Sequence, residues 1–451
     1  MKIEGRGAKH ALSTTRVVAL GFAFVILVGS VLLSLPIASA TGESVGYFDA
    51  LFTSTSCVCV TGLVVVDTGT AYSTFGHVVI ILLIQIGGLG FMSVAMLYFM
   101  LLGKRVTLGT RLLFQESLNE DRIGGLVRMM RWVIFSALSI EAVGAALLAT
   151  RFIPIYGFGK GLWYGVFHSI SAFCNAGFDL IGGYQNLMPF QLDPVVNITI
   201  TLLIIIGGLG FGVLLDIWKT RSFRKLRLHS KIVLTFTGIL LLSGTLIVLA
   251  VEWSNPKTLG PMNFFQKLQA AFFQSVTLRT AGFNTIDQAA LLPSTKLLSV
   301  LLMFIGASPA STGGGIKVST MAVLYLTVRM VVRGRSEISA FQRTIPRALT
   351  QRALAIVFIG VCVLLLDVMA LTLLEPEMDS LDLAFECASA LGTVGVSSIG
   401  TSNLGALSRL LLILTMYTGR VGPLTLTRAI GHKQAQPRDM YRYPEDRVLV
   451  G

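Results

Sequence analysis

The chain has 451 residues, of which 53% are hydrophobic and only 13% are charged, and its mean hydropathy is +0.76. Because a soluble domain carries about twice that charged fraction, the composition excludes an ordinary soluble protein. Apolar runs of roughly 20 residues, the length that spans a bilayer, recur along the chain, for example from Val17 to Leu35. This first run is too long for the apolar core of a cleavable signal, so we expect it to be the first spanning helix.

The distribution of basic residues predicts the topology. The formal net charge is +13, yet no lysine or arginine occurs between Arg16 and Lys104 or between Arg352 and Arg409. The basic residues gather in five blocks, at 2–16, 104–131, 219–231, 329–352 and from 420 onward. Since basic loops stay cytoplasmic, we expect both termini on the inner side of the membrane, with the lipid bilayer and not nucleic acid as the surrounding partner.

Four membrane segments separate the five blocks, and each must leave and return to the same side. The run Leu82–Phe91 reappears as Leu202–Phe211, and weaker copies occupy Leu301–Gly306 and Leu414–Gly422. Such internal similarity predicts four structural repeats, which we place at 1–110, 111–222, 223–340 and 341–451. The expected fold is an all-α polytopic membrane protein with eight transmembrane helices. We expect Gly87–Gly90 to lie inside a spanning helix and to pack against a neighbouring helix.

A second repeated element precedes each of these runs. It contains a glycine followed, after 25, 30, 24 and 24 residues, by the first glycine position of the run. A short amphiphilic stretch of 9 to 15 residues comes before each element, which is too short to span and predicts a re-entrant pore helix. The four elements are Cys59–Leu63, Cys174–Phe178, Arg279–Phe283 and Gly392–Val396, and the stretches are Phe48–Ser56, Leu162–Phe173, Phe264–Leu278 and Leu381–Leu391.

These elements have the residue types of a cation pore. Non-helical backbone at membrane depth survives only where it is buried in protein or lines water, and four such segments can present rings of carbonyls that replace an ion's hydration shell. Glycine permits the backbone angles that this requires, and a pore helix adds about half a negative charge at its C-terminus. A turn or a helix-packing glycine would explain any one of these glycine-containing elements taken alone. It would not explain four of them in matched positions. The expected ion-binding residues of this selectivity filter are Val60, Thr61, Gly62, Asn175, Ala176, Gly177, Thr280, Ala281, Gly282, Thr393, Val394 and Gly395.

Acidic residues follow or precede the elements and would concentrate cations at the pore mouth, although ordinary solvated loop acids are an equal alternative for each. They are Asp49, Asp67, Asp179, Asp193, Asp287, Glu375, Glu377, Asp379 and Asp382. The five cysteines lie in apolar context and suggest packing. No P-loop, zinc motif or dinucleotide motif occurs, so we expect no enzyme, no organic cofactor and no metal beyond the monovalent ion.

The filter elements, with Thr280–Phe283 and the glycine-rich break at 306–315, resemble the TrkH/KtrB/HKT superfamily of potassium transporters over nearly the whole chain. The number of helices, Tyr443–Pro444 and the terminal Gly451 are similar to the KtrB branch. The resemblance implies four M1-P-M2 repeats around a pseudo-fourfold pore, a homodimer, and a cytoplasmic ring of nucleotide-binding, KtrA-type regulatory subunits. It implies K⁺ as the transported ion and Na⁺ as a candidate activator. In plant relatives a serine at the position of Gly62 goes with sodium transport, so Gly62 favours potassium.

The same resemblance implies a gate. The stretch from 306 to 317, rich in glycine and containing Pro309, resembles the family's intramembrane gate loop; a kink in a packed helix is the alternative. Arg420 takes the place of Gly88 and Gly208 and matches the family's pore-facing arginine. Because a buried arginine costs about 2.5–3.5 kcal/mol, snorkelling to the cytoplasmic interface is its alternative. The expected gate residues are Gly306, Ala307, Ser308, Pro309, Ala310, Ser311, Thr312, Gly313, Gly314, Gly315, Lys317 and Arg420.

The predicted function is potassium uptake driven by the membrane potential, which supplies about 2.3 kcal/mol per charge per 100 mV. The alternative is a Na⁺-coupled secondary cation transporter that works by alternating access. Repeats of such transporters are usually inverted and paired in twos, whereas these four share one orientation. Three acids near apolar runs, Glu141, Asp367 and Glu386, are expected to be structural rather than a proton relay.

Overall fold

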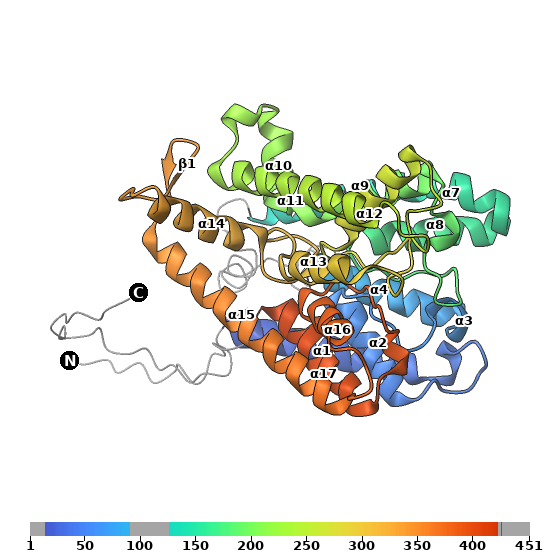
Figure 1. Cartoon of the computed structure of the whole chain (residues 1–451). Coiled ribbons are helices and arrows are strands. Elements are labelled where there is room, and N and C mark those ends of the chain that lie inside the picture. The colour runs from blue at the N-terminus through green and yellow to red at the C-terminus, as the bar shows by residue number, and fades with distance from the viewer. Residues whose placement is uncertain (1–13, 91–125, 423–424, 426–451) are drawn as a thin grey trace, which may run out of the picture.

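The computed structural model describes residues 14–90, 126–422 and 425, and these form an almost entirely helical structure (Figure 1). Strands β1 (Ser339–Ala340) and β2 (Arg343–Thr344) make one small antiparallel hairpin between α14 and α15. Most of the N-terminal arm, most of the basic block at 104–131 and the tail with Tyr443, Pro444 and Gly451 lie outside the described residues.

Four helices in the described ranges are long and apolar enough to cross a membrane. Their mean hydropathies are 2.6, 1.9, 2.4 and 2.9. Each exposes large apolar side chains, such as Phe24 at 67% and Leu373 at 77%, as a lipid-facing helix does. The four are α1 (Thr14–Ser34), α7 (Leu126–Tyr156), α11 (Leu228–Glu252) and α15 (Arg347–Leu374).

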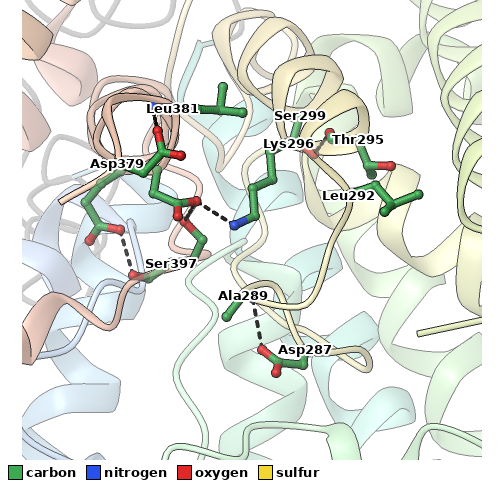
Figure 2. Close-up of polar contacts among 12 residues, drawn as sticks. Asp287, Ala289, Leu292, Thr295, Lys296, Ser299, Asp379, Leu381 and Ser397 are labelled. Carbon is green, nitrogen blue, oxygen red and sulfur yellow. Dashed lines mark hydrogen bonds and ion pairs between the residues drawn. The ribbon is translucent and has the colours of Figure 1, made fainter. Parts of the chain in front are cut away.

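A short helix follows each long one, and all four lie where the amphiphilic stretches predict them. They have 13 to 16 residues, fewer than the roughly 20 that a span needs. Polar side chains begin two of them: Asn263 and Gln266 form a capping box on α12, and Asp379 accepts from the Leu381 amide of α16 (Figure 2). The short helices are α2 (Tyr47–Cys59), α8 (Phe158–Phe173), α12 (Phe264–Thr277) and α16 (Ser380–Gly392).

A third helix follows each short one and ends at the glycine-rich run. Gly90, Gly210 and Gly422, directly after three of these helices, have φ of 80°, 92° and 92°, in the region that favours glycine. The prediction that Gly87–Gly90 lies inside a helix is correct for Gly87 and Gly88, which are in α4 and pack closely against Val58 and Cys174. It is wrong for Gly90, because the helix ends at Leu89 where Gly90 takes a positive φ. The third helices are α4 (Thr74–Leu89), α9 (Pro194–Leu209), α13 (Pro293–Phe304) and α17 (Ala406–Val421).

Within the residues that the structure describes, two of these third helices are followed by another helix after a break. Helix α10 (Phe211–Thr220) leaves α9 at an angle of 96°. Helix α14 (Val318–Val332) starts only after the non-helical stretch 305–317, and meets α15 at the hairpin on the left of Figure 1. Within the described ranges, four helices meet the criterion for a span, or five if α9 and α10 count as one. The apolar helices α4, α13 and α14 are shorter than this criterion requires, so the expected number of eight stays a prediction. The remaining short elements are α3 (Thr68–Ala71), η1 (Pro36–Ala38), η2 (Met188–Phe190), η3 (Phe223–Lys225) and η4 (Thr401–Asn403).

The packing order of the helices is cyclic. The third helix of each unit contacts the short helix of another: α4 contacts α8, α9 contacts α12, α13 contacts α16, and α17 contacts α2. Each short helix also packs against the long helix before it. Large buried side chains on the short helices, including Phe52, Phe173, Phe273 and Phe385, are at most 1% exposed. The short helices and the segments that follow them therefore form the centre of the structure.

Candidate functional site

The four segments after the short helices share one backbone turn. The residue two before each glycine is left-handed, with φ of 58°, 60°, 69° and 51°, which is uncommon for residues other than glycine. The glycines themselves have φ of 96°, 70°, 81° and 96°. The turn aligns Val60 with Asn175, Thr280 and Thr393. Thr61, which the sequence groups with the other two threonines, consequently stands one residue later, level with Ala176, Ala281 and Val394.

Each of the four glycines lies against the backbone of a neighbouring segment. A β-carbon built on Gly62 would lie 2.5 Å from the carbonyl oxygen of Ala176, and one on Gly282 would lie 2.8 Å from that of Val394. Side chains are therefore excluded at these positions, both by space and by φ. The facing pairs, glycine then carbonyl, close into a ring: Gly62 with Ala176, Gly177 with Ala281, Gly282 with Val394, and Gly395 with Thr61. The structure thus brings all twelve predicted filter residues together.

Hydroxyl groups on the short helices support the ring, and the sequence reading missed them. Ser56 Oγ accepts from the amide of Gly62 and Ser389 Oγ from that of Gly395, both at 3.0 Å. Ser171 Oγ donates to the carbonyl of Phe178 at 2.8 Å, and Thr277 Oγ1 donates to that of Phe283. A hydroxyl five or six residues before every glycine was the signal available in the sequence.

The ring offers oxygen ligands. No acid or base stands among the twelve predicted filter residues. Thr61 Oγ1 and Thr393 Oγ1 are buried and have no hydrogen-bond partner within the part of the chain that the structure describes. Carbonyl and hydroxyl oxygens without a fixed charge suit a monovalent cation that binds and then leaves.

The stretch 306–317 packs directly against one side of the ring. It is a loop and not a kinked helix, because α13 ends at Phe304 and α14 begins at Val318. A β-carbon on Gly313 or Gly314 would collide with the side chain of Thr280 or Thr393. Thr312 Oγ1 donates to the Phe173 carbonyl at 3.1 Å and to Asn175 Oδ1 at 3.2 Å. The loop therefore touches the second, third and fourth of the glycine segments that form the ring.

Main-chain hydrogen bonds hold this loop in place. Its ends are joined by the bond from the Gly306 amide to the Ile316 carbonyl, at 2.8 Å. Its middle is bound to the break between α9 and α10: Ser308 N donates to Gly208 O, and Phe211 N to Ala310 O, both at 3.0 Å. The partly exposed Pro309 and Ser311 lie in the same turn, where Ser311 Oγ donates to the Ser308 carbonyl at 2.6 Å.

Cationic side chains bind carbonyls of the loop, among them the loop's own Lys317 and Arg420 of α17. Lys317 Nζ donates to the carbonyls of Gly313 and Gly314, at 2.8 and 3.3 Å. Arg420 Nη1 donates to the Thr312 carbonyl at 2.5 Å, and its Nη2 donates to the carbonyls of Gly87 and Gly88 at the end of α4. Arg420 therefore turns into the protein and does not snorkel away from it. It connects α17, the loop and α4.

The acids expected at the mouth serve mainly local structure. Asp193 caps α9 and pairs with Arg151 at 2.7 Å, and Asp49 pairs with Arg409 at 3.2 Å. Figure 2 shows Lys296 of α13 pointing toward the start of α16, where its Nζ lies 2.6 Å from Asp382 Oδ1.

One of these acids, Asp179, is connected to the ring through a single residue, Asn186. Asn186 Nδ2 donates to Asp179 Oδ2 at 3.1 Å and to the Gly177 carbonyl at 3.2 Å. Burial, with the neighbouring Asp67 adding to it, raises the pKa of Asp179 to about 6. The three acids that we expect to be structural each accept a hydrogen bond from a neighbouring side chain. Glu386 accepts from Ser397 and Thr401, Asp367 accepts from Thr415, and Glu141 accepts from Gln85.

The apolar helices and the oxygen-lined ring together define an integral membrane protein of the cation-transport class. The model of the TrkH family, described as cation transport protein, matches residues 10–440. The chain is 43% identical to Ktr system potassium uptake protein B of Bacillus subtilis, over 97% of this chain and 96% of that one. It is 38% identical to potassium/sodium uptake protein NtpJ of Enterococcus hirae over the full length of both.

A solved structure shows the same fold. The potassium transporter TrkH from Vibrio parahaemolyticus superposes with a TM-score of 0.72, at 18% identity, over 94% of this chain and 86% of that one. The chain belongs to the TrkH family of cation transport proteins, and its resemblance to the KtrB type is confirmed.

Proposed function

We propose that this chain takes up potassium through the ring of four glycine segments. The observation that carries the proposal is the closed order of the ring, in which each glycine faces a carbonyl of the next segment. Carbonyls so placed can replace the hydration shell of K⁺. The names of its relatives, potassium uptake protein B and potassium/sodium uptake protein NtpJ, support the same substrate class.

The pore is formed by four M1-P-M2 repeats around a pseudo-fourfold axis. The cyclic contacts of α4, α9, α13 and α17 with the short helices support this arrangement. Each short helix ends at the ring, so its C-terminal dipole contributes about half a negative charge to the site. The membrane potential drives K⁺ inward, at about 2.3 kcal/mol per charge per 100 mV.

The loop 306–317 is the gate, and the described conformation is closed. The contacts of Gly313 and Gly314 with the filter threonines, and the bonds from Lys317 and Arg420, support this assignment. Opening requires the loop to leave the ring, which breaks the bonds that Arg420 makes to it.

Control comes from outside the chain. A cytoplasmic, nucleotide-binding ring of the KtrA type docks on the basic cytoplasmic surfaces, and the transporter is a homodimer in the bacterial plasma membrane with both termini inside. The printed name of the B. subtilis relative, a component of a Ktr system, supports the presence of a partner. Na⁺ acts as an activator and not as the main cargo.

Expression in a bacterium that lacks its own potassium uptake tests this function. With the regulatory partner present, the chain should restore growth at low K⁺, and Gly282→Ser should abolish it. Growth that is not restored, or that Gly282→Ser leaves unchanged, contradicts the pore. A fixed stoichiometry between K⁺ and Na⁺ flux would favour the alternating-access alternative.

A further inference from the structure

The third filter segment carries a buried arginine where the other three have small or apolar residues. Arg279 occupies the position of Cys59, Cys174 and Gly392, two residues after the end of α12 and directly before Thr280, which has a positive φ. It is only 8% exposed. Its Nη2 donates to the carbonyl of Gly306, the first residue of the gate loop, at 3.2 Å. Its Nε is buried without a partner among the residues that the structure describes.

No carboxylate of the described chain pairs with this cation, and the C-terminal end of α12 beside it contributes only about half a negative charge. The ion pairs found within residues 14–90 and 126–422 are Arg151 with Asp193, Lys296 with Asp382, and Arg409 with Asp49, none of which involves Arg279. A guanidinium does not lose its proton in proteins. Burying it unpaired costs several kcal/mol, so a compensating negative charge is expected beside it.

A small cavity lies against the guanidinium. Its volume is about 20 Å³, and it lies between α9, α11, the end of α12 and the gate loop. A cavity needs about 10–15 Å³ to hold one water-sized particle, so this one holds a single particle. Besides Arg279, Thr237 of α11 brings a hydroxyl to the wall, and the remaining wall is largely apolar, with Ile204, Leu241, Val276 and Ala307.

We propose that this cavity binds one small inorganic anion, a halide such as chloride, held by Arg279 Nε and the hydroxyl of Thr237. The guanidinium has five donors and no acceptor, and the threonine hydroxyl can donate as well. A cation is repelled there, and a water molecule would bond to Nε without neutralising the charge. The anion cancels a positive charge that would otherwise stand beside the third filter segment and oppose a cation in the ring.

Bromide tests the site directly, because its anomalous scattering distinguishes it from water. Crystals of the full chain grown in bromide should show an anomalous peak in the cavity beside Arg279. Thr237→Val, which keeps the shape of the side chain and removes the hydroxyl, should reduce the peak. Thr235→Val, on the same helix but not on the cavity wall, should leave it unchanged. A cavity without a bromide peak, or a peak that is the same in Thr237→Val, overturns the proposal.

A solution measurement gives a second readout that does not depend on crystals. In lipid nanodiscs, the melting temperature of the wild-type chain and of Thr235→Val should rise saturably when chloride replaces gluconate. Thr237→Val should need roughly tenfold more chloride, as expected for one lost hydrogen bond to a charged group. Equal chloride dependence in Thr237→Val and Thr235→Val, or no chloride dependence, also overturns the site. Neither readout uses potassium transport, so a missing anion and a failed pore remain distinguishable.

Discussion

Arg420 Nη1 donates to the main-chain carbonyl of Thr312 at 2.5 Å, across 108 positions of sequence. Through this bond the last described helix holds the loop that packs against the filter ring. Arg420 Nη2 donates to the carbonyls of Gly87 and Gly88 at the end of α4, so one side chain links α17, the loop and α4. Removing that side chain should release the loop, and the first prediction concerns this release.

Arg420→Gln should raise K⁺ flux in the absence of any regulatory partner. Hydrogen bonds to a charged donor contribute about 1.5–3 kcal/mol each, so the closed loop should lose at least tenfold in population. Rubidium uptake into proteoliposomes measures the change. The matched control is Arg409→Gln on the same helix, whose pair with Asp49 lies away from the loop. Unchanged or lower flux in folded Arg420→Gln would count against its role in the gate.

Gly282→Ala should abolish uptake while Gly238→Ala should not. A β-carbon on Gly282 would meet the Val394 carbonyl at 2.8 Å, and its φ of 81° costs a side chain about 1–2 kcal/mol. Gly238, on α11, has nothing within 4 Å of the added carbon. The same rubidium assay, with protein amount checked by size-exclusion chromatography, compares the two. Normal uptake by Gly282→Ala would mean that the ring is not the path of the ion.

Ser389→Ala should weaken ion selectivity. It deprives the Gly395 amide of its acceptor at 3.0 Å, and leaving a buried donor unpaired costs about 1–3 kcal/mol. The fourth segment should then adopt more than one conformation, and the preference for K⁺ over Na⁺ should fall while total flux persists. Competition of Na⁺ against rubidium uptake measures this preference. Ser34→Ala, which removes an exposed hydroxyl on α1, is the control; equal selectivity in both variants would disprove the support role.

External acid should weaken potassium uptake through Asp179. Its pKa of about 6 means that the carboxylate is charged at pH 7.5 and neutral at pH 5. Losing one negative charge close to the pore mouth changes cation binding by about 1 kcal/mol, so the apparent KM for K⁺ should rise roughly fivefold over this range. Asp179→Asn should show the high KM at both pH values, whereas Asp287→Asn, an exposed acid, should keep the wild-type profile. A pH dependence that survives in Asp179→Asn would assign it to another group.

The repeated features of this fold could be predicted from sequence, and the contacts between repeats could not. The matched spacing of the four glycines located the four segments that meet in the ring, and the amphiphilic stretches before them located the short helices. The end of α4 was missed because a run such as Gly87–Gly90 suits a tightly packed helix as well as a break, and only the left-handed φ of Gly90 separates the two. The acceptors of Arg420 on α4 lie more than 330 residues away, where no local pattern points.

The sequence identified the residues of the ring. It did not identify their relative positions along the proposed pore axis or the helix hydroxyls that hydrogen-bond to them. Thr61 directly precedes its glycine, whereas Thr280 and Thr393 stand two residues before theirs, so grouping the three threonines missed an offset that the sequence already contains and the backbone turn confirms. Ser389 and its counterparts were missed because a hydroxyl inside a helix usually bonds to its own helix. In this protein the segment that follows the helix turns back, and the amide of Gly395 donates to the Ser389 hydroxyl.

The most direct test of the pore is the position of a bound ion. Rubidium, soaked into crystals of the chain, should give an anomalous peak inside the ring, within reach of the carbonyls of Thr61, Ala176, Ala281 and Val394. That peak should disappear in Gly282→Ala. Rubidium bound elsewhere in the membrane region, with the ring empty in a protein that still takes up rubidium, would contradict the account.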